Sequence, residues 1–456
     1  MPLWSSKQAG PPPLQLPSSN HALIFQGILW TSLFVLLGKA VSAAKEVAVA
    51  WQYGVSEQID AYLFVFNLIC WPVSIWFAAL PPVLVPLVLY IQSHNHEDLK
   101  QFRAELFGLT CILSGLLFIA TWFVFKVVLG STWSGLPAAL TATAADMLKV
   151  LIFLGPIGLL ISLFSSWILA GGGRANTLLE SLPALTILGA IIFFVIDGPA
   201  PLLWGTLLGF TAHLMCVATV LRANSQIERP RFCMRSPHWK VFWQSFGVMV
   251  AGQTLMSSAV LVDQLSAAQL PTGTVSILSY ANRVLALVTG LGVTAVQRGT
   301  LPIFSKAQMH ELQRLASPWV RGLFFIGLVS IGIGWWLGPF GVKLLFERGA
   351  FSSTDTEAVT HALRHGLFQL PFYFSGIVLA ALLSARGRYT GIALASAGCL
   401  LVKIIGNAIL VPIFGLAGLQ WSTGLMYAFL FFMLWILAKK SAPAAIPEPI
   451  QPPQSV

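Results

Sequence analysis

The stretch SYANRVLALVTGLGVTAVQRGTLPIFSKA, residues 279–307, decides the fold of this chain. It is apolar enough to cross a membrane, yet it contains two arginines, Arg283 and Arg298, and a proline, Pro302. At about 100° per residue, the spacing of the arginines leaves them only about 60° apart around a helix. Each charge placed in hydrocarbon costs at least about 2.5–3.5 kcal/mol. Two arginines on one side of a membrane helix therefore need a physical reason, and an anionic ligand is the first to consider.

The composition places the whole chain in the same class as this stretch. Of its 456 residues, 56% are hydrophobic and 9% are charged, and long apolar runs recur from end to end. Soluble domains do not have this composition, and alternating apolar and polar strands of an outer-membrane barrel are absent. The five cysteines are scattered, and no spacing suggests a metal site or a disulfide framework. The sequence therefore predicts an all-α polytopic membrane protein.

Hydropathy divides the chain into about 12 transmembrane helices. The predicted segments are 23–52, 60–91, 104–129, 147–170, 176–197, 200–222, 241–265, 272–304, 319–346, 361–385, 390–412 and 416–438. Residues 1–22 contain PPP and one lysine and are expected to be a disordered tail, not a signal peptide. Residues 439–456 are expected to be a second tail.

The basic residues of the loops fall almost entirely on one side of these segments. That side carries Lys7, Lys100, Arg103, Arg174, Arg222, Arg229, Arg231, Arg235, Lys240, Lys306, Arg314, Arg321, Arg386, Arg388, Lys439 and Lys440. The other side has Lys343, Arg348 and Arg364. By the positive-inside rule, both termini and the basic loops are cytoplasmic in a bacterial inner membrane.

The two halves of the sequence show a weak internal repeat. Arg174 in GGGRANT and Arg388 in ARGRYTG are 214 residues apart (388 − 174), and Pro156 and Pro371 correspond at nearly the same offset. An even number of helices per repeat gives both halves the same orientation. We predict two six-helix lobes, 23–222 and 241–438, around a central cavity, joined by a basic cytoplasmic linker at 223–240.

Several charged residues are predicted to lie inside the membrane. Lys39, Lys45 and Glu46 lie in the first segment and Arg283 and Arg298 in the eighth. Since cations outnumber the carboxylates, the remaining positive charge favours an anion such as a pyrophosphate, which arginine binds with two parallel hydrogen bonds.

Each of these residues also has a structural interpretation. Lys39 and Glu46 share a helix face and can form a structural pair, and Arg298 can anchor the cytoplasmic end of its helix. Asp263 is the nearest carboxylate to Arg283 in sequence, and Asp60 and Glu46 are further possible charge partners. Three further lysines lie in or near the predicted helices. Lys126 and Lys149 are expected at the membrane boundary, and the sequence assigns no role to Lys403.

Three stretches resemble the MurJ (MviN) lipid II flippase family. They are residues 279–307, FERGAFSSTDT at 346–356 and AAKEVAVAWQYGVSEQIDAYLFVF at 43–66. The resemblance covers most of the chain and implies the fold of the multidrug/oligosaccharidyl-lipid/polysaccharide (MOP) exporters. It matches the family's cavity arginine to Arg283 and two first-helix arginines to Lys39 and Lys45.

The sequence departs from the family pattern at several positions. A second-helix arginine of the family is replaced by Val73, and two acidic residues of the eighth helix are Asn282 and Ala286. The chain also ends after the twelfth segment, so we expect no further C-terminal helices. A member that moves another undecaprenyl-pyrophosphate-linked sugar, such as an exopolysaccharide or O-antigen precursor, is therefore an alternative to a lipid II flippase.

The leading hypothesis is a transporter, not an enzyme. We expect alternating access of a lipid-linked pyrophosphate saccharide, with substrate contacts from Arg283, Lys39, Lys45 and Arg298. A drug or cation antiporter on the same fold would need an acidic cavity, and a glycosyltransferase would need loop carboxylates, for which only Asp355 and Glu357 qualify. We expect membrane lipids as surroundings, a monomer, and no cofactor, metal or nucleic acid.

Overall fold

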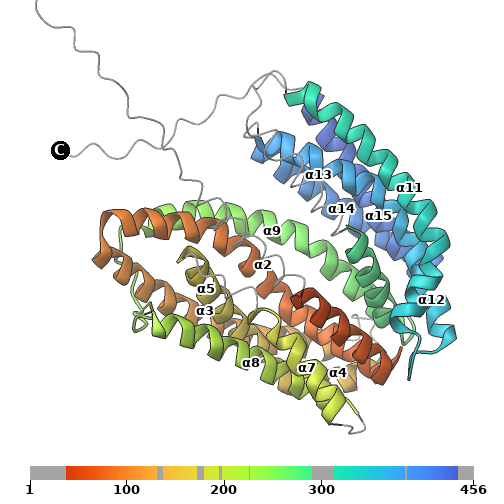
Figure 1. Ribbon diagram of the computed structural model, residues 1–456, viewed down its shortest axis with the longest axis horizontal. Helices are drawn as coiled ribbons and strands as arrows, with labels where there is room; N and C mark the ends of the chain where they lie inside the picture. Colours follow the sequence, from red (N-terminus) through yellow and green to blue (C-terminus); the bar gives the residue numbers. More distant parts are fainter. Residues whose placement is uncertain are drawn as a thin grey trace, which may run out of the picture.

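The computed structural model describes residues 37–130, 137–171, 179–194, 198–224, 226–289, 312–385 and 388–439. Every regular element in these ranges is a helix (Figure 1). The two predicted tails, apart from Lys439, lie outside the described residues, as does Arg298.

The labelled helices are α2 (Glu57–His94), α3 (His96–Gly130), α4 (Ala138–Leu151), α5 (Leu154–Ala170), α7 (Leu182–Phe193), α8 (Ala200–Ala223), α9 (Trp239–Ala268), α11 (Leu312–Phe346), α12 (Ser353–Gly366), the 3₁₀ helix η2 (Leu367–Gln369), α13 (Leu370–Ala385), α14 (Tyr389–Phe414) and α15 (Leu416–Lys439). Two further helices carry no label. They are helix 37–53 and helix Thr274–Thr289.

The helices agree with the twelve predicted segments. Within the described residues, eight helices are long and apolar enough to cross a membrane, with α12, η2 and α13 together making one of them. Each of the other four segments contains a helix: helix 37–53, the α4–α5 pair, α7 and helix Thr274–Thr289. The chain is therefore a multi-pass helical membrane protein.

The predicted segment 147–170 contains a break, and Pro156 gives the physical reason. The chain bends by 44° between α4 and α5, at Ile152 and Phe153. A proline has no N–H group for the carbonyl four residues earlier, and its ring clashes with that carbonyl. For Pro156 that carbonyl belongs to Ile152. Pro371 stands in the same relation to Leu367, where η2 interrupts the helix between α12 and α13.

These two breaks belong to a repeated packing pattern. In the first half α3 packs on α5 and α7 packs on α8, while in the second half α11 packs on α13 and α14 packs on α15. Figure 1 shows α3, α4, α5, α7 and α8 on one side and α11 to α15 on the other, with α9 beside α2. The pairing of corresponding helices supports the internal repeat seen in the sequence.

Residues 226–238 connect α8 to α9 without regular structure and lie against α3. The N–H of Arg231 donates to the carbonyl of Ala104 at 2.8 Å. Glu105 accepts hydrogen bonds from the backbone N–H groups of Arg235 and Ser236, both at 3.0 Å, and from the indole of Trp239 at 2.7 Å. A single buried carboxylate therefore fixes both the connection and the start of α9.

The two halves also meet through the loop between α11 and α12. The N–H of Ala350 donates to the carbonyl of Trp51 at 2.7 Å, at the end of helix 37–53. Gly54 and Gly349 both have positive φ angles, of 54° and 63°. A Cβ on Gly54 would lie 2.4 Å from the carbonyl oxygen of Ala350, and one on Gly349 would lie 2.3 Å from the carbonyl oxygen of Trp51. Only glycine allows the two backbones to approach this closely.

We therefore expect the substitution Gly349→Ala to destabilise the protein by about 1–3 kcal/mol, because it adds both backbone strain and a backbone clash. Thermal unfolding of the purified protein in detergent measures this as a lower Tm. Gly341→Ala is the matched control, since Gly341 lies within α11 and an added Cβ there meets no atom within 4 Å. An equal effect of both substitutions would contradict the proposed contact.

Candidate functional site

Helix Thr274–Thr289 carries Arg283, and Asp60 of α2 fixes the start of this helix. The two carboxylate oxygens of Asp60 accept hydrogen bonds from the N–H groups of Gly273 and Ser276, the latter at 2.7 Å. The first N–H groups of a helix have no acceptor within the helix, and buried ones need a partner from elsewhere. Asp60 was predicted as a charge partner, but the structure gives it this capping role because it lies at the helix N-terminus.

Tyr280 holds the same helix one turn further along. Its buried hydroxyl donates to the carbonyl of Gly54 at 3.2 Å, beside the close contact with the α11–α12 loop. The guanidinium carbon of Arg283 lies 5.2 Å from the centroid of the Tyr280 ring, which is the range of a cation–π contact. Arg283 therefore extends from a helix whose position is set by α2 and helix 37–53.

Arg283 belongs to a cluster of three charged side chains. Glu46 forms ion pairs with Arg283 and with Lys45, the latter at 2.6 Å. The side chains of Lys45, Glu46 and Arg283 are 22%, 19% and 26% exposed, so the cluster is largely shielded from solvent. Two cations share one carboxylate, which leaves one net positive charge in the cluster.

The cluster lines a cavity of about 410 Å³, which we call the first cavity. Its volume lies within the range of roughly 300–1,000 Å³ that is usual for small-molecule sites. The wall contains the stacked rings of Tyr62 and Phe66, with centroids 5.6 Å apart, and the ring of Phe210. Beyond the cluster, the lining includes the carboxylate of Glu180 and the polar side chains of Asn67 and His213. The cavity thus combines a cationic group with aromatic and hydrogen-bonding surfaces.

The other residues predicted for this site are placed differently. Lys39 has an exposed side chain and does not pair with Glu46, because Glu46 already binds Lys45 and Arg283. Val73, which replaces the arginine of the family pattern, lines the first cavity next to Gly158, where a Cβ would lie 2.5 Å from the Val73 side chain.

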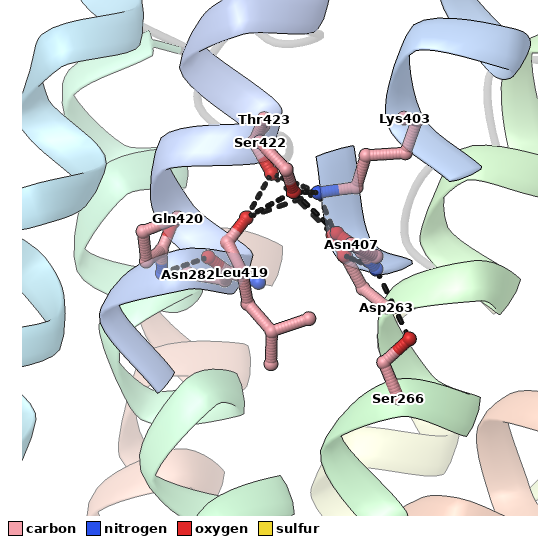
Figure 2. A network of polar contacts seen from close by, with 9 residues as sticks. All are labelled: Asp263, Ser266, Asn282, Lys403, Asn407, Leu419, Gln420, Ser422 and Thr423. Atoms are coloured by element: carbon pink, nitrogen blue, oxygen red, sulfur yellow. Dashed lines mark hydrogen bonds and ion pairs between the residues drawn. The ribbon is translucent and has the colours of Figure 1, made fainter. Parts of the chain in front are cut away.

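The sequence suggested Asp263 as a possible charge partner of Arg283. In the structure Asp263 pairs with Lys403 instead. The Lys403 ammonium lies 2.7 Å from one oxygen of Asp263, and its side chain is 0% exposed. Figure 2 shows the two side chains facing each other from α9 and α14. The sequence left Lys403 without a role, although charge balance contained a signal: it is a lysine in the middle of an apolar helix, and Asp263 is a carboxylate in another.

A metal site finds no support in the described ranges. They contain no group of three or more histidine, cysteine, aspartate or glutamate side chains that could hold an ion. His361 and His365 lie close together, with their Nε2 atoms 3.3 Å apart, and His365 accepts a hydrogen bond from the indole of Trp421 at 3.0 Å.

Comparison with known proteins gives a consistent result. The family model of the lipid II flippase MurJ matches residues 49–451. The lipid II flippase MurJ of Burkholderia cenocepacia is 23% identical over 433 residues, covering 88% of this chain and 81% of that protein. The probable lipid II flippase MurJ of Buchnera aphidicola subsp. Baizongia pistaciae is 21% identical over 383 residues, covering 80% of this chain and 74% of that protein.

Solved structures share the fold. A structure of the lipid II flippase MurJ in an inward closed conformation superposes with a TM-score of 0.79 at 19% identity, covering 90% of this chain and 88% of that one. An inward-facing multidrug resistance MATE family transporter of the MOP superfamily gives a TM-score of 0.65 at 16% identity, covering 87% of this chain and 94% of that one. The predicted fold class, an all-α MOP-type membrane protein, is confirmed.

The capping role of Asp60 makes a prediction about stability. Asp60→Asn leaves one side-chain oxygen for two buried N–H groups, so we expect a loss of about 1–3 kcal/mol, seen as a lower Tm in detergent. Asp146→Asn is the control, because Asp146 pairs with Lys149 at the surface, where the two side chains are 79% and 72% exposed. If both variants unfold at the wild-type temperature, Asp60 does not hold this helix.

Proposed function

This chain belongs to the lipid II flippase MurJ family, and from that premise we propose that it moves a lipid-linked pyrophosphate saccharide between membrane leaflets. The substrate is lipid II or a related undecaprenyl-linked precursor, carried from the inner to the outer leaflet by alternating access. The observation that carries the proposal is the Lys45–Glu46–Arg283 cluster, which places two cations in a shielded cavity.

A pyrophosphate matches the chemistry of this cluster. Its oxygens accept hydrogen bonds from a guanidinium in parallel pairs, and a second cation adds a point charge from the ammonium of Lys45. Without substrate, Glu46 supplies the negative charge that both cations need in a low-dielectric cavity. A pyrophosphate that enters the cavity competes with Glu46 for the same donors, and Lys39 and Arg298 are proposed as additional contacts along the path.

The contacts between the two halves support an alternating-access cycle. Two contacts join the first half of the chain to the second at one end of the helices. They are the close backbone contact between Gly54 and Ala350 and the hydrogen bonds of Asp60 to the start of helix Thr274–Thr289. With the basic loops in the cytoplasm, this end faces outward. We infer that the described conformation is closed on the outer side, and that substrate release requires these contacts to separate.

Two other functions are less well supported by the site. A drug or cation antiporter would need net negative charge, whereas in the first cavity the carboxylates of Glu46 and Glu180 are matched by the cations of Lys45 and Arg283. A glycosyltransferase would need accessible loop carboxylates, but Asp355 accepts a hydrogen bond from the N–H of Ser352 at 2.8 Å as part of a helix cap, and Glu357 lies within the helix α12. A flippase for a different undecaprenyl-linked oligosaccharide remains the second candidate, since Val73 and Asn282 depart from the family pattern.

The topology completes the proposal. We propose an inner-membrane location with both termini in the cytoplasm, lobes at 23–222 and 241–438, and the connection at 223–240 on the cytoplasmic side. The working unit is proposed to be a monomer.

Arg283→Ala is the test of this function. The substitution removes the guanidinium and its paired hydrogen bonds, so we expect translocation of lipid II in proteoliposomes to fall by at least about thirtyfold, which corresponds to a loss of about 2 kcal/mol. Arg283→Lys keeps the positive charge but cannot form the paired hydrogen bonds of a guanidinium, and it is expected to retain intermediate activity.

The matched control is Arg321→Ala, which removes an exposed arginine of α11 away from the cavity. Size-exclusion profiles and Tm values in detergent establish that each variant folds. Wild-type translocation rates in a folded Arg283→Ala protein would refute the assignment of this site.

A further inference from the structure

A second cavity lies on the other side of helix Thr274–Thr289. It has a volume of about 360 Å³ and is bounded by this helix together with α9, α13, α14 and α15. Asn282, Ala286 and Thr289 line it, at spacings of four and three residues that share one helix face. Arg283 lies about 100° further around the same helix and lines the first cavity instead. One helix therefore presents a cation to one cavity and small or uncharged groups to the other.

The second cavity contains one ion pair. Its two charged lining residues, Asp263 and Lys403, form the ion pair and neutralise each other. The ammonium of Lys403 also donates to the Leu419 carbonyl at 3.0 Å, to the Ser422 hydroxyl at 2.8 Å and to the Thr423 hydroxyl. Figure 2 shows this network joining α9, α14 and α15. A lysine bound to four oxygens is held in place and is not a free cation for a phosphate.

The Asp263 carboxylate remains partly accessible to a ligand. One of its oxygens binds Lys403 and the side-chain amide of Asn407, the latter at 3.1 Å. The other oxygen accepts only a long contact of 3.5 Å from the Thr423 hydroxyl among the described residues. Its side chain is 15% exposed, and it lines the cavity. This oxygen is a suitable acceptor for a ligand hydroxyl.

Two tyrosines supply the opposite kind of surface. The rings of Tyr373 and Tyr427 are 5.0 Å apart at an angle of 82°, and both line the second cavity. Neither hydroxyl has a hydrogen-bond partner in the part of the chain that the structure describes. Gln369, which is buried, uses its amide nitrogen to bind the Gly366 carbonyl at 2.8 Å and leaves its oxygen for another donor. Apolar ring faces flanked by a few polar groups are the usual walls of a site for a small polar ligand.

We propose that the second cavity binds the saccharide part of the substrate while the first cavity binds its pyrophosphate. This inference rests on the proposed function. A neutral sugar presents hydroxyl and amide groups, which match Asp263, Gln369 and the tyrosine hydroxyls, and C–H faces, which pack on the tyrosine rings. An uncompensated carboxylate this close to a pyrophosphate would repel it, and Lys403 removes that repulsion. Asp263 is thereby available as a hydrogen-bond acceptor without opposing the anion in the neighbouring cavity.

Two ligands, one with the saccharide-containing head group and one without it, test the inference. Binding of lipid II and of sugar-free undecaprenyl pyrophosphate to the full chain in detergent is measured for wild type, Tyr427→Ala, Gln369→Ala and Arg283→Ala. We expect Tyr427→Ala and Gln369→Ala to weaken lipid II binding about tenfold and to leave undecaprenyl pyrophosphate within twofold of wild type. Arg283→Ala is expected to weaken both ligands. Leu425→Ala is the control, because Leu425 is on the same helix as Tyr427 but is 52% exposed.

The possible results separate the two proposals. If Tyr427→Ala and Gln369→Ala leave lipid II binding unchanged, or weaken both ligands equally, the saccharide site is overturned while the effect of Arg283→Ala still supports the pyrophosphate site. If Arg283→Ala changes neither ligand, the proposed function loses its site. Should Tyr427→Ala fail to fold, the double variant Tyr373→Phe/Tyr427→Phe decides the question, since it keeps both rings and removes only their hydroxyls. It is expected to weaken lipid II selectively by at least threefold, and an unchanged preference between the ligands would overturn the inference.

Discussion

The need to compensate buried charge is the constraint on which the rest of this structure depends. A charged side chain in the hydrocarbon region is tolerated only when it faces the protein interior and finds a partner there. Among the residues that the structure describes, two arrangements meet this requirement, Glu46 between Lys45 and Arg283 and Asp263 against Lys403. The first places two cations on one carboxylate, and the second is a one-to-one pair. The first cavity also contains the carboxylate of Glu180, so the two cavities differ in how their charges are arranged and not in their formal net charge.

Helix Thr274–Thr289 links the cavities to the contacts between the two halves. Its start is capped by Asp60, its next turn is bound to Gly54 through Tyr280, and Arg283 follows three residues later. Any movement that separates the halves at Gly54 and Ala350 must break or carry along these bonds. The position of the cation in the first cavity is therefore coupled, by direct hydrogen bonds, to the contacts that we propose close the outer side.

Much of the fold was predictable because its causes are local in the sequence. Hydropathy located the twelve segments, and the internal repeat placed Pro156 opposite Pro371. A proline follows each of the two helix breaks, although neither break was predicted, since an apolar run of sufficient length conceals a bend. Gly349 of the α11–α12 loop was part of a recognisable stretch, but the reason for a glycine there, the close approach of the Trp51 backbone, appears only when the halves are assembled.

By itself the sequence determined that the protein is a polytopic helical membrane protein with charged residues inside, because hydrocarbon selects against every unneeded charge and leaves those that remain visible. It singled out Arg283 in this way. Only the tertiary structure decided which carboxylate serves which cation: Arg283 pairs with Glu46 and not with Asp263, Lys403 pairs with Asp263, and Asp60 caps a helix. Ion pairs form between side chains within a few ångströms, and helices more than a hundred residues apart in the chain reach that distance only through packing.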